Sequence, residues 1–405
     1  MKRLLQINTT LNFGSTGRIV ENIGLLANTK GFETYVIHGP RFVNSSQLKN
    51  FCTEGKFEEK LHGLKSLLGD AHGLGSKRAT LRTIEFIDQI KPDIIHLHNI
   101  HGYYINYPIL FNYLKKINVP VVWTFHDCWS FTGHCAHFHI VGCYKWEKEC
   151  NNCPIIGSYP KSFLDFSKRN FNLKKDSFTG IDNLIIVSVS DWLKGLIQRS
   201  FLKDYKINRI YNGINTRVFY PRNDASKIRR KYRLEDKFII LGVASPWSEG
   251  KGFGDFLQLS NFLSQDEIII LVGLDKQQIK SLPSNIIPIE RTNSVDFLAD
   301  LYSTADLFFN PSKQETFGLT TAEALACGTP ALVYNVTACP EIVDTLSGFV
   351  IKEGDINGVL RVVSEVKLRG KNFFKKHCLQ RIQEKFKDED CYNKYIELYD
   401  KLLNK

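Results

Sequence analysis

The chain has 405 residues, of which 43% are hydrophobic and 23% charged, and its formal net charge is +11. This length is too great for a single hydrophobic core, and we expect two domains. The longest apolar runs, such as residues 268–274, have the length of strands and are too short to cross a bilayer. The N-terminal apolar run, Leu4–Leu5, is too short for a signal peptide, so we expect a cytoplasmic protein.

The positive charge is concentrated in one half of the chain. Residues 1–220 carry 28 Lys and Arg against 17 Asp and Glu, whereas the remaining residues carry 25 of each. A basic half can serve nucleic acid, an anionic membrane surface or a phosphate-bearing substrate. It can also be an ordinary solvated surface.

Strand-like runs alternate with helical periodicity in the first half of the chain, which is typical of parallel α/β sheets. Residues 3–9 predict a strand, and residues 17–31 predict a helix that ends at a glycine. Further strands are predicted at residues 34–39, 93–99, 119–127 and 183–190.

A second series of strands follows a break in the pattern. Residues 211–224 are rich in Asn and Pro and lack either periodicity, which indicates a linker. The second series is predicted at residues 237–245, 266–273, 285–290, 306–312 and 329–335. We therefore expect two Rossmann-like domains, at 1–214 and 215–385, and a helix at 386–405 that could pack back on the first domain. Two such domains that face each other would form an interdomain cleft.

Two glutamates, Glu315 and Glu323, flank the sequence TFGLTTA. If a helix begins after the first, they lie about 12 Å apart along its axis. The carboxyl pairs of glycoside hydrolases are about 5 to 9.5 Å apart, so these two form a poor acid/base pair. The amides of Phe317, Gly318 and Leu319 would instead point out of the helix N-terminus, where a diphosphate is favoured. The alternative is an ordinary helix with an acidic first turn.

The surrounding residues carry a resemblance. Residues 310–335, NPSKQETFGLTTAEALACGTPALVYN, resemble the nucleotide-sugar site of the retaining family 4 glycosyltransferases, with the Glu-x7-Glu element, an upstream Pro-Ser and a downstream Ala-x-Gly-x-Pro. The stretches NGINTRVFYP, LYSTADLFFNPS and SEGKGFGDFL match in the expected order. The resemblance implies the GT-B arrangement, in which two facing Rossmann-like domains bind a donor such as a UDP- or GDP-sugar mainly through the second.

The resemblance also assigns roles in the second domain. Glu315 would bind hydroxyls of the donor sugar, Glu323 would bind the ribose, and Lys251 would neutralise the diphosphate as the glycosidic bond breaks. It implies that the transfer requires no metal cofactor. The family usually has an arginine just after the strand that precedes that lysine, whereas this chain has Ser245-Pro246-Trp247 there.

In the first domain, the sequence NFGSTGR follows the first strand, and Gly14 and Gly17 permit close approach to a phosphate or sugar. By resemblance these glycines face the donor. His126 and Asp127 end a later strand and resemble the family's His-Asp, so His126 would bind donor hydroxyls and Asp127 would orient His126 or the acceptor. A structural role is the alternative for both residues.

Two further clusters permit a metal interpretation. His96 and His98 share one strand face, with His101 beyond, but no carboxylate follows at metal spacing, and we expect His98 at most to line the cleft. Residues 128–153 contain five of the ten cysteines. A structural zinc is predicted at Cys135, Cys143, Cys150 and Cys153, with His134, His137 or His139 as substitute ligands, and reduced cysteines are the alternative. A similar segment occurs in family members that act in bacterial surface polysaccharide assembly.

The sequence therefore predicts a retaining glycosyltransferase that acts on a glycan or lipid-linked acceptor, with peripheral contact to anionic membrane. One alternative is a sugar-nucleotide epimerase or hydrolase on the same fold. A second is a non-catalytic nucleic-acid-binding protein, which no nucleic-acid-binding motif supports, so we expect no nucleic-acid partner.

Overall fold

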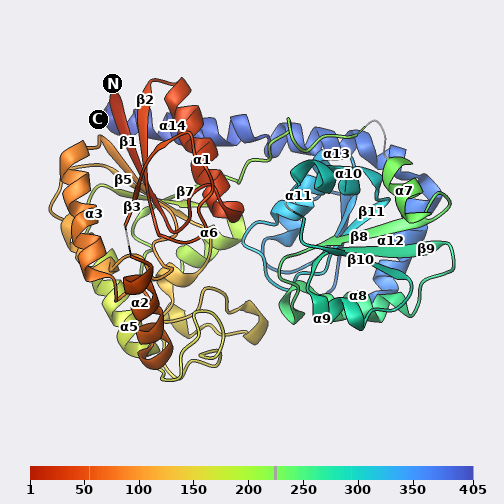
Figure 1. Cartoon of the computed structure of the whole chain (residues 1–405), viewed down its shortest axis with the longest axis horizontal. Helices are drawn as coiled ribbons and strands as arrows, with labels where there is room; N and C mark the ends of the chain where they lie inside the picture. The colour runs from red at the N-terminus through yellow and green to blue at the C-terminus, as the bar shows by residue number, and fades with distance from the viewer. Residues whose placement is uncertain (54, 223–225, 293, 405) are drawn as a thin grey trace. The chain divides into compact units, whose positions relative to one another are not determined.

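The computed structural model describes residues 1–53, 55–222, 226–292 and 294–404, which form two compact units (Figure 1). The first unit contains Met1–Tyr211 and the C-terminal residues from Tyr392, and the second contains Asn212–Cys391. The chain passes to the second unit slightly before the predicted position and returns slightly after it. Residues 223 and 224 of the predicted linker and residue 405 of the predicted C-terminal helix lie outside the described residues.

The first unit is built on a seven-stranded parallel sheet with the order β3-β2-β1-β4-β5-β6-β7. Its strands are β1 (Lys2–Asn8), β2 (Phe32–His38), β3 (Lys49–Cys52), β4 (Ile94–Leu97), β5 (Val121–Phe125), β6 (Leu184–Ser188) and β7 (Lys206–Arg209). The strand order reverses between β1 and β4. In open parallel sheets, ligands bind beyond the carboxyl ends of the strands at such a reversal.

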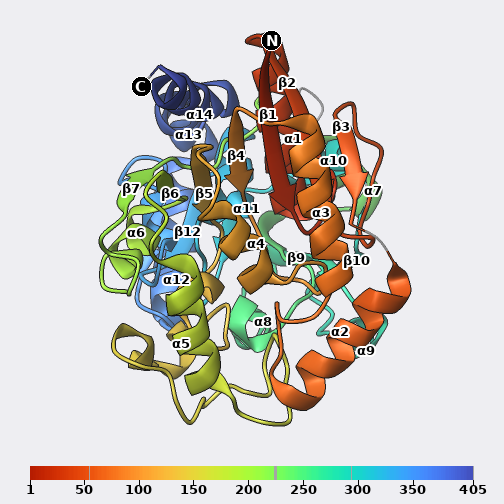
Figure 2. The ribbon, with the colours of Figure 1, turned by 90° about the vertical axis from the view of Figure 1, so that its left-hand side faces the viewer.

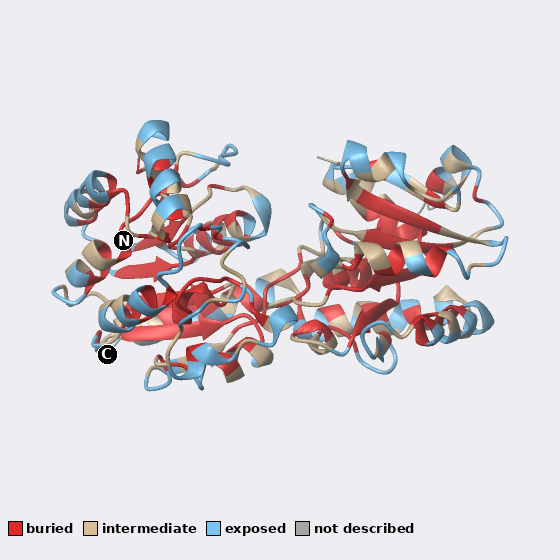
Figure 3. Cartoon of the chain, turned by 90° about the horizontal axis from the view of Figure 1, so that it is seen from below, coloured by how far each residue is buried: buried red, intermediate tan, exposed pale blue. Residues whose placement is uncertain are grey.

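Helices cover both faces of this sheet (Figure 2). They are α1 (Gly14–Thr29), α2 (Lys56–Gly69), α3 (Lys77–Ile90), α4 (Tyr107–Leu114), α5 (Ser167–Phe178), α6 (Asp191–Ile197) and α14 (Asp388–Leu403). The inner strands are apolar on both faces, as expected for a sheet covered on both sides. Figure 3 shows them as the buried core of the unit.

The second unit repeats the plan with a six-stranded parallel sheet in the order β10-β9-β8-β11-β12-β13. Its strands are β8 (Phe238–Val243), β9 (Glu267–Leu274), β10 (Ile286–Glu290), β11 (Leu307–Asn310), β12 (Ala331–Tyr334) and β13 (Gly348–Ile351). Its helices are α7 (Ser226–Tyr232), α8 (Phe253–Ser260), α9 (Lys276–Lys280), α10 (Val295–Thr304), α11 (Leu319–Ala326), α12 (Ile356–Arg369) and α13 (Lys371–Lys385). Here the strand order reverses between β8 and β11.

The C-terminal helix α14 begins in the second unit and ends against the first sheet. The hydroxyl of Tyr399 lies 2.6 Å from His96 Nδ1 on β4, and the hydroxyl of Tyr395 accepts a hydrogen bond from Thr124 on β5. Lys2 at the start of β1 forms an ion pair with Asp400. These contacts bring the two ends of the chain together.

The predicted strands all form, but three further strands were not predicted. The missed strands, β3, β7 and β13, have four residues each, and β3 and β7 contain little apolar sequence. The first helix also begins earlier than predicted, at Gly14 rather than at residue 17. Among the described residues, no helix is both long and apolar enough to cross a membrane.

Candidate functional site

The strand reversal of the second sheet brings Lys251 and Glu315 together. Lys251 ends a short 3-10 helix, Glu249–Lys251, that follows β8, and Glu315 follows β11. The two residues are far apart in sequence, but parallel strands place their carboxyl ends at one edge of the sheet. The Nζ of Lys251 lies 2.6 Å from Oε1 of Glu315.

This ion pair is partly shielded from solvent. The side chain of Glu315 is 19% exposed and that of Lys251 is 39% exposed. Burial lowers the pKa of Lys251, but the adjoining Glu315 carboxylate outweighs that effect, and the pKa is raised. Lys251 is therefore a cation throughout the neutral range, held at a fixed position.

A glycine allows the loop of Lys251 to approach the end of β11. Gly252 has a positive φ of 75°, and a Cβ on it would lie 2.5 Å from atoms of Pro311. The amide of Lys313 donates to the carbonyl of Gly250. Because a side chain at Gly252 would clash with backbone and ring atoms, the close approach depends on glycine.

The helix α11 begins beside Glu315. Gly318 precedes it with a φ of 106°, and the first helical hydrogen bonds run from the amides of Thr321 and Ala322 to the carbonyl of Gly318. The amides of Gly318 and Leu319 therefore come before the helical hydrogen-bond ladder, where a helix attracts anions. The side chain of Phe317 is buried and its ring contacts that of Phe386.

A residue that the sequence did not indicate fixes the backbone of Glu315. The hydroxyl of Thr337 accepts a hydrogen bond from the amide of Glu315, and the amide of Ala338 donates to the Glu315 carbonyl. Thr337 has a φ of 49°, which is unusual for a β-branched residue. The segment after β12 thus holds Glu315 from both sides.

Glu323 lies on α11 and has its own partner. The hydroxyl of Tyr302, at 0% exposure, donates to Oε2 of Glu323 over 3.0 Å. Burial and this carboxylate both raise the pKa of Tyr302, which therefore remains a donor. Glu323 contacts a different residue from Glu315, as expected if the two have different roles.

In the stretch where the family usually has an arginine, Ser245 and Pro246 are exposed and Trp247 is buried. Trp247 is 6% exposed, donates from its indole to the carbonyl of Val272 and packs edge-on against Phe256. Trp247 is therefore used for packing. Another cation, Lys313, lies two residues before Glu315, but it forms an ion pair with Glu249.

In the first unit, the two predicted glycines lie in the first turn of α1 rather than in a loop before the helix. Gly14 is exposed and has a φ of 65°. A Cβ at Gly17 would lie 2.7 Å from the hydroxyl of Thr10 and 3.2 Å from the amide of Asn12. Gly14 is therefore required by backbone conformation and Gly17 by close packing against the loop after β1.

His126 belongs to a chain of polar contacts at the strand reversal of the first sheet. Its Nε2 lies 3.1 Å from Nδ1 of His98, whose Nε2 lies 3.2 Å from Oε1 of Gln6 on β1. Burial lowers the pKa of His126 to about 4, so the ring is neutral at neutral pH. His98 is 1% exposed and contacts His126, so it does not line a surface, which agrees with the limited role expected for it.

The other residues of this region also have structural partners. Asp127 accepts hydrogen bonds from His101 Nε2 over 2.8 Å and from the amide of Trp129 over 2.8 Å. Burial raises the pKa of Asp127, but His101 and the other partners outweigh it and lower that pKa to about 2. His96 bridges Thr124 and Tyr399. Asp127 thus pairs with His101, and its expected role in orienting His126 or the acceptor stays a prediction.

The cysteine-rich segment 128–153 is held by aromatic packing. Phe131, Phe138 and Trp146 are buried, with ring centroids of the Phe131–Trp146 and Phe138–Trp146 pairs 5.0 and 5.1 Å apart. The buried ammonium of Lys174 donates to two carbonyls of the segment and lies 3.5 Å from the ring centroid of Trp129. The segment therefore has a core of its own.

The four thiols of the predicted zinc site line one small cavity with His134. Burial raises the pKa of Cys150 to about 12 and that of Cys153 to about 11, so both thiols are protonated at neutral pH. Across the described parts of the chain, no three His, Cys, Asp or Glu residues are arranged to hold a metal ion. The zinc site stays a prediction.

Two family models match the chain and together cover both units. The model "Glycosyltransferase Family 4" matches residues 51–218, and "Glycosyl transferases group 1" matches residues 237–366. The second match includes Lys251, Glu315, Glu323 and α11, and the first includes His126 and the cysteine-rich segment. The chain belongs to the family 4, or group 1, glycosyltransferases.

Two known proteins illustrate the similarity in sequence. The chain is 24% identical over 388 residues to the "Uncharacterized 41.2 kDa protein in cps region" of Klebsiella pneumoniae, covering 93% of this chain and 98% of that protein. It is 26% identical over 210 residues to the O-antigen biosynthesis glycosyltransferase WclY of Escherichia coli, which covers 50% of this chain and 57% of WclY.

The fold is similar to that of HepE from Anabaena in complex with UDP-glucose. The TM-score is 0.68, with 14% sequence identity, 99% of this chain and 100% of that chain covered. The predicted GT-B fold, with its two parallel-sheet Rossmann-like domains, is thereby confirmed.

Proposed function

We propose that this glycosyltransferase is a retaining enzyme that moves a sugar from a nucleoside diphosphate donor to a glycan or lipid-linked acceptor in surface polysaccharide biosynthesis. The observation that carries the proposal is the Lys251–Glu315 pair at the start of α11. It joins a fixed cation, a partly exposed carboxylate and a helix N-terminus at the strand reversal of the second sheet. The similarity to WclY supports the polysaccharide context.

Each group has a role in this proposal. The diphosphate would bind Lys251 and the amides of Gly318 and Leu319, which favour negative charge. Glu315 would accept hydrogen bonds from sugar hydroxyls, and Glu323 would accept them from the ribose. The leaving diphosphate gains charge in the transition state, so the same cation and amides would lower the barrier.

The proposal requires neither a metal cofactor nor a carboxylate nucleophile. Lys251 and the helix amides would supply the charge stabilisation that a metal supplies elsewhere. The acceptor would attack from the face that the diphosphate leaves, and the departing phosphate would take the proton of the acceptor hydroxyl. The anomeric configuration of the donor would then be retained.

Donor binding is the first test. The full chain is incubated with a panel of UDP- and GDP-sugars, and the melting temperature is measured for each, because a ligand that binds only the folded state raises it. We expect one sugar nucleotide to raise the melting temperature more than its free nucleoside diphosphate. Glu315→Ala should lose the part of the increase that depends on the sugar. Equal stabilisation by all nucleotides in both proteins would contradict the site assignment.

Turnover separates transfer from epimerisation or hydrolysis. Donor consumption is measured with and without a glycan acceptor, and the anomeric configuration of the product is determined by NMR. We expect consumption to depend on the acceptor and the donor configuration to be retained. Consumption without an acceptor would favour an epimerase or hydrolase, and inversion would contradict the proposed mechanism.

We further propose that the enzyme works in the cytoplasm, in peripheral contact with the inner face of the cytoplasmic membrane. The basic residues of the first half of the chain support this location, because the cytoplasmic leaflet carries a negative surface potential. A lipid-linked acceptor would lie at the same surface.

A further inference from the structure

The helix α2 is oriented with its polar side inward and its apolar side outward. Phe57, Leu61, Leu64 and Leu68, which follow one another at helical spacing along one face, are exposed. Phe57 is 81% exposed and Leu64 is 50% exposed. An ordinary surface helix of a soluble protein buries such a stripe against the core.

The inward face of α2 is polar and firmly bound. The buried residues of α2 are Glu59, His62 and Ser66. His62 accepts hydrogen bonds from the amides of Gly73 and Gly75 at Nε2, and its Nδ1 lies 2.9 Å from the hydroxyl of Ser76. Burial lowers the pKa of His62 to about 4. The inverted orientation is therefore fixed by specific contacts rather than by chance packing.

A second exposed apolar segment adjoins the C-terminal end of α2. Phe163, Leu164 and Phe166 are exposed, and Phe163 is 64% exposed. The amide of Phe163 donates to the carbonyl of Leu67 over 2.8 Å. We call the exposed apolar side chains of α2 and of residues 163–166 together the α2 surface.

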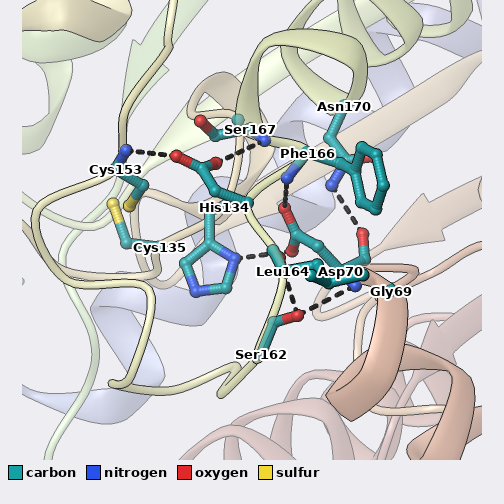
Figure 4. Close-up of polar contacts among 12 residues, drawn as sticks. Gly69, Asp70, His134, Cys135, Cys153, Ser162, Leu164, Phe166, Ser167 and Asn170 are labelled. Atoms are coloured by element: carbon teal, nitrogen blue, oxygen red, sulfur yellow. Dashed lines mark hydrogen bonds and ion pairs between the residues drawn. The ribbon is translucent and has the colours of Figure 1, made fainter.

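Buried polar contacts hold the two parts of the α2 surface together (Figure 4). The carboxylate of Asp70, at 1% exposure, accepts hydrogen bonds from His134 Nδ1 over 2.6 Å and from the amide of Phe166 over 3.2 Å. The amide of Asp70 donates to the hydroxyl of Ser162, and its carbonyl accepts from Asn170. The apolar side chains thus project from a preformed backbone.

Basic side chains surround the α2 surface. The exposed cations of α2, of the first turn of α3 and of residues 161–169 are Lys56, Lys60, Lys65, Lys77, Arg78, Lys161, Lys168 and Arg169, of which Lys168 pairs with Glu149, and Asp165 is an exposed carboxylate among them. Phe57 and Leu61 line one hollow together with Lys65, Lys77 and Arg78, and Glu58 also lines it. The hollow lies at the N-terminus of the 14-residue helix α3, and its cations are suited to a lipid phosphate.

We propose that the α2 surface binds an anionic lipid bilayer, with its apolar side chains in the acyl–headgroup boundary and its cations at the lipid phosphates. An exposed apolar stripe bordered by Lys and Arg is the pattern of helices that lie in a membrane interface. A second copy of the chain is a poorer occupant, because it would bring the same cations close to one another, whereas anionic lipid neutralises them. The inference extends the proposed function, since a lipid-linked acceptor would lie at this surface.

Sedimentation with vesicles tests the proposal directly on the full chain. Vesicles of phosphatidylcholine alone are compared with vesicles that contain phosphatidylglycerol, at low and high salt. We expect binding that increases with phosphatidylglycerol and decreases with salt. The double variant Phe57→Ser/Leu64→Ser should reduce the bound fraction at least fivefold, and Lys65→Glu/Lys77→Glu should abolish the preference for anionic lipid.

A matched control variant lies in the second unit. Leu346 and Leu368 are 46% and 88% exposed, so Leu346→Ser/Leu368→Ser removes the same kind of side chain from a different surface. This variant should bind vesicles like the parent protein. Because all the substituted side chains are exposed, the melting temperatures should change little, which shows that the variants are folded.

Two outcomes would overturn the proposal. The first is equal binding of the parent chain and Phe57→Ser/Leu64→Ser to anionic vesicles. The second is a parent chain that is dimeric without lipid while the same variant is monomeric, since this would make the α2 surface a subunit interface. Transfer to a short water-soluble acceptor is measured in parallel. Transfer should be unchanged in the variants. Vesicle binding therefore tests the membrane proposal, and transfer to the soluble acceptor tests the proposed function.

Discussion

The two units share a parallel Rossmann-like sheet but hold the polar residues at its carboxyl edge in different ways. The first unit has ten of the eleven histidines, and there His98 contacts His126 and Gln6, while His101 contacts Asp127. In the second unit, one partly exposed ion pair stands beside a helix N-terminus. The second unit thus leaves a charged pair partly exposed, whereas these histidines of the first unit are held in contacts within the unit.

The histidines of the first unit predict the largest effect, a loss of stability in weak acid. Burial lowers the pKa of His62 and of His126 to about 4, against an ordinary value of 6.5. Between these values the unfolded chain binds more protons than the folded protein, so the free energy of unfolding decreases as the pH falls. Each of these two histidines should lower the free energy of unfolding by on the order of 3 kcal/mol at pH 4, relative to neutral pH.

Urea unfolding at several pH values checks this expectation. Tryptophan fluorescence reports mainly on the first unit, because Trp123, Trp129, Trp146 and Trp192 belong to it and Trp247 to the second. His126→Gln should remove only the share of the pH dependence that His126 contributes between pH 6.5 and 4, because burial also lowers the pKa of His72, His96 and His98. An unfolding free energy that is constant over this range would show that these histidines are protonated in the folded protein.

The second-largest expected effect is a loss of stability when the aromatic packing of the cysteine-rich segment is removed. Trp146 is 1% exposed between Phe131 and Phe138, so Trp146→Ala should lower the free energy of unfolding by about 3–5 kcal/mol. Urea unfolding measures the loss. Cys150→Ser is the control, because it changes one atom in the same segment and should cost much less if aromatic packing holds it.

The predicted zinc is tested on the same preparation. About one zinc per chain, measured by elemental analysis on protein purified without a metal-affinity resin, would support the four-cysteine site. In that case Cys150→Ser should release the metal and destabilise the segment as much as Trp146→Ala. Protein without zinc, whose thiols titrate in the folded state, would leave aromatic packing as the support of the segment.

The sequence predicted the second unit better than the first for a physical reason. One short stretch of chain contains Glu315, Gly318 and Glu323. Their spacing alone therefore places Glu315 before α11, Gly318 at its start and Glu323 within it. Thr337 and Tyr302 were not predicted, because their contacts arise only when separate strands meet at the sheet edge. No periodicity in the sequence indicates such contacts.

In the first unit, the sequence located five of the seven strands, but not the partners of the residues that follow them. His98 was expected at most to line the cleft, and its contacts with Gln6 and His126, which belong to two other strands or their ends, were not predicted. Asp127 adjoins His126 in the chain but pairs with His101. The pattern of α2 was also not recognised, because an apolar stripe looks the same in sequence whether it faces the core or the outside.

Lys251→Ala tests whether Lys251 is the cation that neutralises the donor diphosphate. Because the chain has Ser245-Pro246-Trp247 where the family usually has an arginine, we expect a roughly 10²-fold lower rate at saturating donor. Lys251→Arg, which keeps the charge, should recover part of the rate. A negligible loss in Lys251→Ala would show that another cation, such as Lys313, neutralises the diphosphate.

The smallest predicted effect separates the two glutamates of the second unit. Tyr302 holds the carboxylate of Glu323 away from the Lys251–Glu315 pair, so its expected ligand is the ribose and not the reacting sugar. Removal of binding that is equal in the ground and transition states raises KM and leaves kcat nearly unchanged. Glu323→Ala should therefore raise the KM for the donor roughly tenfold, about 1.4 kcal/mol, whereas Glu315→Ala should mainly lower kcat. Tyr302→Phe is the control, because it removes only the hydrogen bond to Glu323 and should give a smaller change in the same parameter. A fall in kcat for Glu323→Ala as large as that for Glu315→Ala would mean that both carboxylates contact the reacting sugar.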